Sequence, residues 1–555
     1  MIRCPIRIFL YGVMLFSIGL FHIAVTPAFE GFDELAHYSA IRQIALEKRI
    51  PSRNDSYVEQ ILVDYQGPRS YSSGVPPFDD GLVYKKFFQN SLLIQNYVSH
   101  YSLAQMPTSF IASNVKNHEY QQHPALYYLL LAPALEAFVH SSLLTQVFIL
   151  RFCSFMLALI GIILGLLALS VDKTDAAQES YKQERLGFFI YPFVFPMTLL
   201  EFSRIGNDSL CLLLVGVVAY LWRKWLRDSS KSGFLIAIGI ALGLGLWTKA
   251  FFVLISAALF IYFVVGASQK IYRTEVTLFS QFKILLFTFA PTALVGAGWY
   301  VFNYVTVGSF SGASVVLELT EHGGFWRGLQ ENFDAFVFLR GLAVIPVTFV
   351  WGGTQSLVHM PSFFYWPLLG FLSVLFIPFT KQLVKLKLAD SYWLSFWLFS
   401  CFLLALGSHA LINMATGGNG NTPGWYLHIL LPFSAPVLGS LLYQKIFNVK
   451  IQPVARFAAA YGFIFLAVAS WYQLSLFYGC AEKGQDKSYV FNTKYLCIEQ
   501  SAAIIDRISV LGHPYFALLS IILLLTAAVS LCAMYRLEAL CDFKDIAVHQ
   551  QVVKQ

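Results

Sequence analysis

The segment Pro27-Ala28-Phe29-Glu30-Gly31-Phe32-Asp33-Glu34-Leu35-Ala36-His37-Tyr38 directly follows the first long apolar run of the chain. It places two adjacent carboxylates, Asp33 and Glu34, beside the end of an apolar helix. Carboxylates next to hydrocarbon lose hydration energy unless a partner or a reaction uses them. Asp33 and His37 are four residues apart, as are Glu34 and Tyr38, so a helix would place each pair on one face. The segment therefore predicts a functional site at the mouth of a membrane helix.

The composition is typical of a chain that lies in a bilayer. Of the 555 residues, 57% are hydrophobic and 12% are charged, with a mean hydropathy of +0.61. Soluble domains carry about 25% charged residues, so a large soluble core is excluded. The formal net charge of +7 reflects Lys and Arg in short loops between apolar runs, as membrane topology requires. It does not imply a nucleic-acid partner.

Apolar runs predict about twelve membrane spans. The first, from about Ile8 to Thr26, follows Arg3 and Arg7 and is long enough to be a signal anchor rather than a cleaved signal peptide. The apolar stretch 125–139 is too short to span, so we expect a juxtamembrane helix in the outer interface. The other predicted spans are 148–171, 187–203, 209–222, 234–248, 251–267, 284–303, 363–379, 392–412, 426–443, 456–478 and 515–534.

Basic clusters orient these spans. They fall on the side of Arg3 in alternate loops, which predicts that both termini are cytoplasmic and that Asp33 emerges outside. If 125–139 spanned, the cluster at 223–231 would lie outside, against this tendency. The polar segments expected outside are the Asp33 loop, 204–209, the Thr248-Lys249 turn, 304–362, 413–425 and 479–514. Their convergence on one membrane face predicts one site there.

The predicted fold class is all-α, a polytopic membrane helix bundle with small helices on its outer face. A long outer loop at 27–147 should begin with an amphipathic helix at about 33–47, and no fold is predicted for residues 50–120. The expected division of the chain is a transmembrane module with this loop at 1–303, an outer loop at 304–362 and C-terminal helices at 363–555.

The cysteines are of two kinds. Cys480 and Cys497 flank a polar loop expected outside, where they form a disulfide if that side is oxidising and remain free thiols if it is not. Others lie within apolar runs and are interpreted as small core residues: Cys153, Cys211, Cys401 and Cys532.

Several motifs occur in a set order in the first half of the chain: Asp33-Glu34, His123-Pro124-Ala125-Leu126-Tyr127-Tyr128, Arg151, Asn207-Asp208 and Trp247-Thr248-Lys249. Their order and topology resemble the GT-C superfamily, integral-membrane glycosyltransferases that use lipid-phosphate-linked sugars. The bacterial aminoarabinose and protein mannosyl transferases are the most similar group. Pro423-Gly424-Trp425-Tyr426-Leu427 resembles the family's Gly-Arg-Tyr-Leu segment, with Trp425 where Arg is often found. The second half of the chain resembles the family only weakly.

The resemblance implies transfer of a sugar from a polyprenyl-phosphate donor to a glycan, lipid or protein acceptor, with inversion in a single displacement. It implies that Asp33 is the base, whereas the alternative is an acid that only favours a helix N-terminus. Glu34 and Asp208 would be supporting acids. The alternative for Glu34 is a structural partner for an Arg or Lys, and the alternative for Asp208 is a helix cap. Glu34 with His37 could also bind a divalent metal, although no zinc-ligand spacing supports this.

A leaving lipid phosphate needs cations as its charge develops. Lys249, Arg204 and Arg340 are the candidate ligands, and the alternative for Lys249 is a side chain that reaches the interface. Further candidate substrate contacts are His37, His123, Tyr127 and Asn207.

Two other classes of protein stay open. A transporter or lipid flippase predicts charges within spans and halves related by symmetry. A non-catalytic polysaccharide-assembly subunit predicts the same helical shell without an essential Asp33. The favoured interpretation is a bacterial inner-membrane glycosyltransferase with an extracytoplasmic site.

Overall fold

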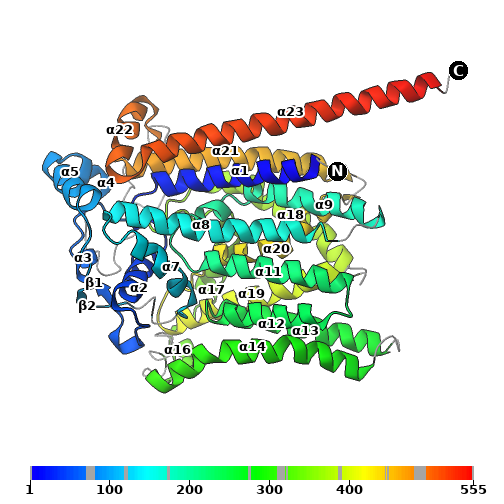
Figure 1. The fold of residues 1–555 in the computed structure, drawn as a ribbon, viewed down its shortest axis with the longest axis horizontal. Coiled ribbons are helices and arrows are strands. Elements are labelled where there is room, and N and C mark those ends of the chain that lie inside the picture. The colour runs from blue at the N-terminus through cyan, green and yellow to red at the C-terminus, as the bar shows by residue number, and fades with distance from the viewer. Residues whose placement is uncertain are drawn as a thin grey trace.

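The computed structural model describes residues 3–70, 82–117, 120, 123–171, 175–272, 277–308, 310, 319, 323–384, 390–443, 445–446, 449–480 and 496–552. Helices that lie side by side form a bundle (Figure 1). They are α1 (Arg3–Val25), α8 (Leu143–Ala168), α9 (Asp175–Val194), α11 (Asp208–Arg227), α12 (Ser232–Leu246), α13 (Phe251–Tyr272), α14 (Leu278–Val307), α18 (Ser362–Val384), α19 (Asp390–Ala415), α20 (Leu431–Leu441), α21 (Gln452–Phe477) and α23 (Pro514–Val552).

Shorter elements connect and cover these helices. The helices are α2 (Glu34–Glu47), α3 (Gln60–Val63), α4 (Tyr84–Phe88), α5 (Ser91–Tyr97), α7 (Leu126–Ala137), α10 (Met197–Phe202), α16 (Phe325–Asn332), α17 (Ala335–Val350) and α22 (Ser501–Leu511). Short 3₁₀ helices are η1 (Arg53–Asp55), η3 (Gly424–Leu430) and η5 (Ile498–Gln500), and η2 (Val98–Leu103) is a short π helix. The strands β1 (Tyr57–Glu59) and β2 (Ala112–Lys116) pair antiparallel, as do β3 (Lys445–Ile446) and β4 (Val449–Lys450).

The prediction of an all-α polytopic membrane protein is confirmed. Within the described part of the chain, eight helices are long and apolar enough to cross a membrane, and α16 with α17, bent by 104°, would make a ninth. The predicted count of twelve is not reproduced. The apolar run at 187–203 is broken between α9 and α10, and the run at 426–443 is divided between η3 and α20. Helix α12 and the apolar part of α13 are shorter than a full span.

Two predicted loops contain structure that the sequence patterns did not reveal. The segment 304–362 contains α16 and the apolar helix α17, which has Arg340 and Pro346 within its apolar sequence. The first outer loop contains α2 to α5 and the small β1–β2 sheet. Helix α2 is not amphipathic as expected, because Arg42 is fully buried and bonds Glu59 at 2.5 and 2.9 Å.

The small elements gather at one end of the bundle. Figure 1 shows α2 to α5, β1 and β2 at the left, together with α16 and α22, and both chain termini toward the right. The end of α1 that leads to Asp33 is therefore at the left. Cys480 and Cys497, which follow α21 and precede α22, are joined in a disulfide with 6.2 Å between their Cα atoms. Of the cysteines interpreted as core residues, Cys211 is buried, whereas Cys532 is exposed on α23.

Helices α8 and α11 pack closely through glycines. A Cβ on Gly161 would lie 2.5 Å from the carbonyl oxygen of Leu212, and one on Gly216 would lie 2.3 Å from the carbonyl oxygen of Gly161. Small residues of this kind let membrane helices approach at backbone distance. The close approach brings α8, which carries Arg151, beside the helix that begins at Asp208.

Candidate active site

Asp33 lies between α1 and α2 in a left-handed backbone conformation, with φ 56° and ψ 12°. This region is uncommon for residues other than glycine, and Asp and Asn tolerate it best. The side chain is exposed, and its carboxylate has no hydrogen bond or ion pair with the described residues. Desolvation by the surrounding protein nevertheless raises the pKa of Asp33, against the effects of Arg204 and Lys249. The carboxyl is therefore accessible from outside, while the surrounding protein disfavours its ionised form.

Two cations and two acids form a buried cluster next to Asp33. Arg204 pairs with Glu201 and, at 3.0 Å, with Asp208. It also donates to the carbonyl oxygen of Phe32 at 2.9 Å, which ties the cluster to the Asp33 loop. Lys249 Nζ bonds both carboxylate oxygens of Asp208, at 2.8 and 3.0 Å. Asp208, predicted as a supporting acid or a helix cap, therefore connects both cations.

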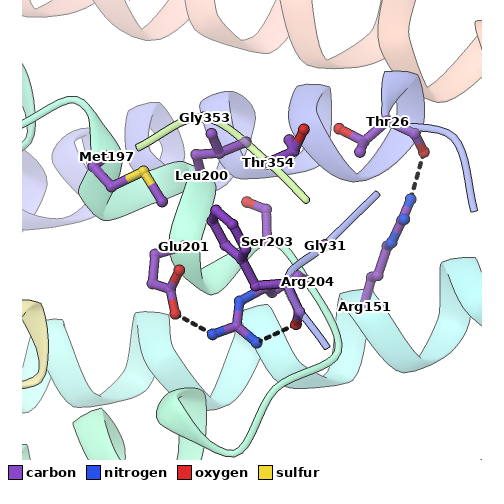
Figure 2. Close-up of a pocket in the computed structure, with 11 residues that line it drawn as sticks. Thr26, Gly31, Arg151, Met197, Leu200, Glu201, Ser203, Arg204, Gly353 and Thr354 are labelled. Carbon is purple, nitrogen blue, oxygen red and sulfur yellow. Dashed lines mark hydrogen bonds and ion pairs between the residues drawn. The ribbon is translucent and has the colours of Figure 1, made fainter. Parts of the chain in front are cut away.

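The cluster retains unused polar atoms. Among the described residues, Arg204 Nε and Glu201 Oε2 are buried without a hydrogen-bond partner. Arg204 and Glu201 line a small cavity whose wall also includes Ser203 and Thr354 (Figure 2). Buried polar atoms are nearly always satisfied by protein, water or ligand. The geometry therefore leaves polar groups available to a bound molecule.

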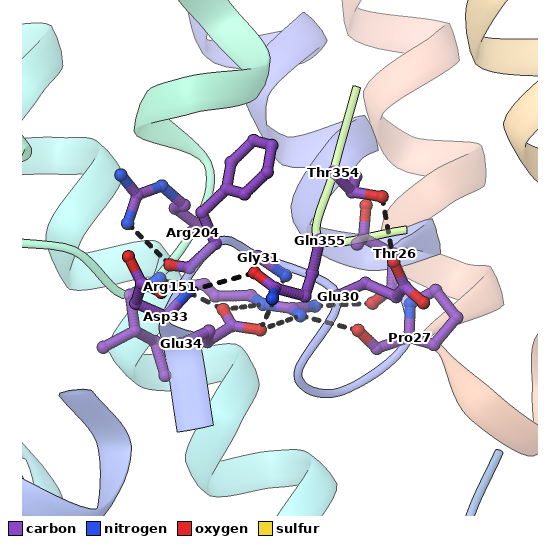
Figure 3. A network of polar contacts seen from close by, with 12 residues as sticks. Thr26, Pro27, Glu30, Gly31, Asp33, Glu34, Arg151, Arg204, Thr354 and Gln355 are labelled. Carbon is purple, nitrogen blue, oxygen red and sulfur yellow. Dashed lines mark hydrogen bonds and ion pairs between the residues drawn. The ribbon is translucent and has the colours of Figure 1, made fainter. Parts of the chain in front are cut away.

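Glu34 is fully engaged by protein groups. Its carboxylate receives Arg151 Nε at 2.7 Å and Nη2 at 2.6 Å, and the N–H groups of Ile205 and Gly31 at 3.1 and 3.3 Å. Figure 3 shows Glu34 and Arg151 in contact beside Asp33. Burial alone would raise the pKa of Glu34, but Arg151 outweighs it and holds the pKa below its ordinary value. This geometry matches the alternative of a structural partner for an arginine.

The predicted histidine and tyrosine contacts lie together near the cluster. The rings of His37 and His123 stack with centroids 5.8 Å apart. His37 Nδ1 is 2.9 Å from the Tyr128 hydroxyl, and the Tyr127 hydroxyl is 2.6 Å from Ser154 Oγ. Burial, reinforced by Lys249, lowers the pKa of His123 to about 3, so its ring is neutral at physiological pH.

Asn207 and the segment after Pro423 reach the same site. Asn207 is buried with its Oδ1 atom unpartnered among the described residues, and its Nδ2 is 3.4 Å from the carbonyl oxygen of Thr248. Lys249 Nζ lies 4.7 Å from the centre of the Tyr426 ring. Trp425 stacks on Phe32, with ring centroids 4.2 Å apart, so this residue contacts the Asp33 loop.

Arg340 is not brought into the cluster. It is exposed on α17 and has no hydrogen bond or ion pair with a described residue. Three residues of the site were missed from the sequence: Glu201, Glu30 and Gln355. Glu201 could have been found as a lone acid in an apolar run. Glu30 stands in the Asp33 loop, whereas Gln355 has no local signal.

The suggested metal site at Glu34 and His37 is not part of a cluster of ligands in the described residues. In the described ranges, no group of three or more His, Cys, Asp and Glu side chains is placed to hold a metal ion. Glu34, one of the two suggested ligands, is occupied by four hydrogen bonds from protein donors.

The fold and site together define a polytopic helical membrane protein with buried acids and cations at one end of its bundle. No family model and no curated protein matches the chain. The chain is similar to a solved structure of ArnT from Cupriavidus metallidurans bound to undecaprenyl phosphate, over 96% of this chain and 72% of that one, with a TM-score of 0.46 and 12% identity. The apo structure of that protein covers 76% of this chain and 75% of its own, with a TM-score of 0.29 and 12% identity.

Proposed function

We propose that the chain transfers a sugar from a polyprenyl-phosphate donor to an acceptor hydroxyl or amine, with Asp33 as the general base. The observation that carries this proposal is the accessible carboxylate of Asp33, unpaired among the described residues, beside Arg204 and Lys249 at the end of a membrane bundle. The order of motifs that resembles the GT-C superfamily supports the same chemistry.

The reaction needs one base and a stabilised leaving group. The acceptor oxygen or nitrogen forms a bond to the anomeric carbon and loses its proton to Asp33. The bond from that carbon to the phosphate oxygen breaks, and the electron pair leaves with the lipid phosphate. The phosphate then carries one more negative charge, which cations fixed near it can stabilise. Attack opposite the leaving group inverts the anomeric centre.

Arg204 and Lys249 are the proposed phosphate ligands. A lysine ammonium has three N–H donors, and Asp208 is the hydrogen-bond partner of Lys249 within the described chain. At least one donor is therefore available, between the rings of Phe251 and Tyr426. Asp208 and Glu201 would hold the two cations in place before the donor arrives, which lowers the cost of ordering them.

The site is proposed to face the extracytoplasmic side of a bacterial inner membrane, with both termini in the cytoplasm. The basic loops support this orientation. The Cys480–Cys497 disulfide supports it independently, because disulfides persist in oxidising compartments. A lipid-linked donor fits this side, where the membrane delivers the substrate.

The test is Asp33→Asn, assayed by release of polyprenyl phosphate from synthetic polyprenyl-phosphate hexoses and pentoses in the presence of a cell-envelope glycolipid extract. Asn tolerates the left-handed conformation, so the variant loses the base without losing the loop. Loss of a general base should lower kcat by about 10²- to 10⁴-fold. Asp64→Asn, at an exposed acid in the same outer region, is the matched control. If Asp33→Asn keeps the wild-type rate, and polyprenyl phosphate raises its thermal midpoint as it does for the wild type, then Asp33 is not the general base.

A further inference from the structure

We propose that Gln355, held in place by Glu30, is a positioning residue that sets the orientation of Asp33. This inference rests on the proposed function of Asp33 as a base. It concerns the segment 351–361, between α17 and α18, which is distant in sequence from the Asp33 loop and which no motif marks as part of the site.

Glu30 fastens this segment to the Asp33 loop. Its side chain is 1% exposed, and its carboxylate accepts four hydrogen bonds. The Ser356 hydroxyl and the Thr354 hydroxyl donate at 2.7 and 2.9 Å, and the Ser356 N–H donates at 3.3 Å. The Tyr84 hydroxyl of α4 donates at 2.6 Å. A buried carboxylate is stable only when its lone pairs are satisfied in this way.

Gln355 lies between Thr354 and Ser356 in the sequence and forms two hydrogen bonds with the Asp33 loop. Its backbone N–H donates to the carbonyl oxygen of Glu30 at 2.8 Å. Its side-chain Oε1 accepts the backbone N–H of Asp33 at 3.3 Å (Figure 3). The side chain of Gln355 therefore bonds the peptide of the proposed base itself.

This bond acts on a strained residue. Asp33 has a left-handed conformation that persists only when surrounding contacts hold it. The turn that contains Asp33 is closed by the bond from the Glu34 N–H to the Gly31 carbonyl oxygen at 3.2 Å, which fixes one side of the residue. Gln355 fixes the peptide on the other side. With both in place the carboxylate stays within the electrostatic influence of Arg204; without Gln355, the Asp33 peptide can rotate and move the carboxylate away from the acceptor.

The experiment uses Gln355→Leu in the full-length protein, because leucine keeps the bulk of the side chain but cannot accept the Asp33 N–H. The backbone bond from residue 355 to Glu30 remains, so the segment stays docked. On a polyprenyl-phosphate sugar that the wild type uses, kcat should fall by about tenfold with an unchanged KM for the donor, because misplacing a reacting group lowers the chemical step. Gln60→Leu, the same change at a glutamine on α3, is the matched control.

A double variant separates positioning from direct contact with substrate. If Gln355 acts through Asp33, then Gln355→Leu should leave the residual rate of Asp33→Asn unchanged. A further fall of about tenfold in the double variant would show that Gln355 acts independently of Asp33 and would overturn the inference.

Failure of the inference and of the proposed function give different results. Wild-type kcat in Gln355→Leu, with Asp33→Asn inactive, overturns the positioning role alone. Full activity in Asp33→Asn overturns the proposed base and the inference with it. A second variant, Thr354→Val, removes one of the four bonds to Glu30; it should also lower kcat without changing the donor KM, and a change in KM alone would contradict the inference.

Discussion

At the scale of single residues, three acids within one short loop have three different environments. Glu30 is buried among hydroxyl and N–H donors, and burial raises its pKa. Glu34 is paired with Arg151, which holds its pKa down. Asp33 alone is exposed and free of hydrogen bonds from the described residues to its carboxylate. The three acids thus have separate roles because their partners differ. Glu30 anchors a distant segment, Glu34 forms a structural ion pair, and Asp33 is the proposed proton acceptor.

The pKa of Asp33 predicts the pH dependence of the reaction. A base works in its ionised form, so the rate rises with pH through its pKa. Because desolvation raises the pKa of Asp33 above its ordinary value of 3.8, the acid limb of kcat/KM should lie above that value. A pH profile measured on the wild type checks this. The limb should be absent from the residual rate of Asp33→Asn, and its persistence there would assign it to another group.

The Glu34–Arg151 pair predicts a coupled effect on stability. The two side chains are 0% and 3% exposed, and removing one partner of such a pair costs about 3–5 kcal/mol because the other charge stays buried. We expect Glu34→Gln and Arg151→Met each to lower the thermal midpoint in detergent. The thermal midpoint of the double variant should fall by less than the sum of the two single falls. A fall equal to that sum would contradict the pairing.

The same pair predicts how stability changes with acid. The folded-state pKa of Glu34 lies below its ordinary value of 4.5, so its contribution is complete above that value and is lost as the pH falls through the lower folded pKa. The thermal midpoint of the wild type should therefore fall more steeply below about pH 4.5 than that of Glu34→Gln. Parallel midpoint curves for the two proteins would show that the ion pair is not responsible.

At the scale of elements, the turn at Gly353 shapes the segment that contacts Asp33. Gly353 has φ +75°, and a Cβ there would lie 2.8 Å from the backbone N and O of Val358. Gly353→Ala should therefore displace the segment 351–361. The free energy of unfolding should fall by about 1–2 kcal/mol, and transfer activity should fall as well. Gly370→Ala on α18 meets open space and should leave both unchanged. Equal behaviour of the two variants would contradict this role of the turn.

At the scale of the whole molecule, the arrangement of polar elements predicts sidedness. Exposed residues at opposite ends of the bundle are Ser91 on α5 and Ser230 between α11 and α12. In spheroplasts, a membrane-impermeant maleimide should label Ser91→Cys directly and Ser230→Cys only after permeabilisation. The reverse pattern would place the Asp33 end in the cytoplasm and contradict the proposed donor side.

Much of the architecture could be predicted because it depends on local composition. Apolar runs of sufficient length form helices wherever they occur in a chain, so the predicted spans all correspond to helical segments. The predicted number of spans is not confirmed, because in the described part of the chain breaks such as the one between α9 and α10 shorten an apolar run. Residues 50–120 could not be folded from the sequence, because the pairing of β1 with β2 joins strands separated by most of that loop.

The sequence by itself determined the membrane class and the candidate acids and cations, since hydrophobicity, charge and spacing are local properties. Only the tertiary structure decided which acid stays free. Glu34 finds Arg151 from another helix, and Asp33 is held by Gln355, 322 residues away. A carboxylate's role depends on what lies within about 3 Å of it, and that neighbourhood exists only after distant segments have packed together.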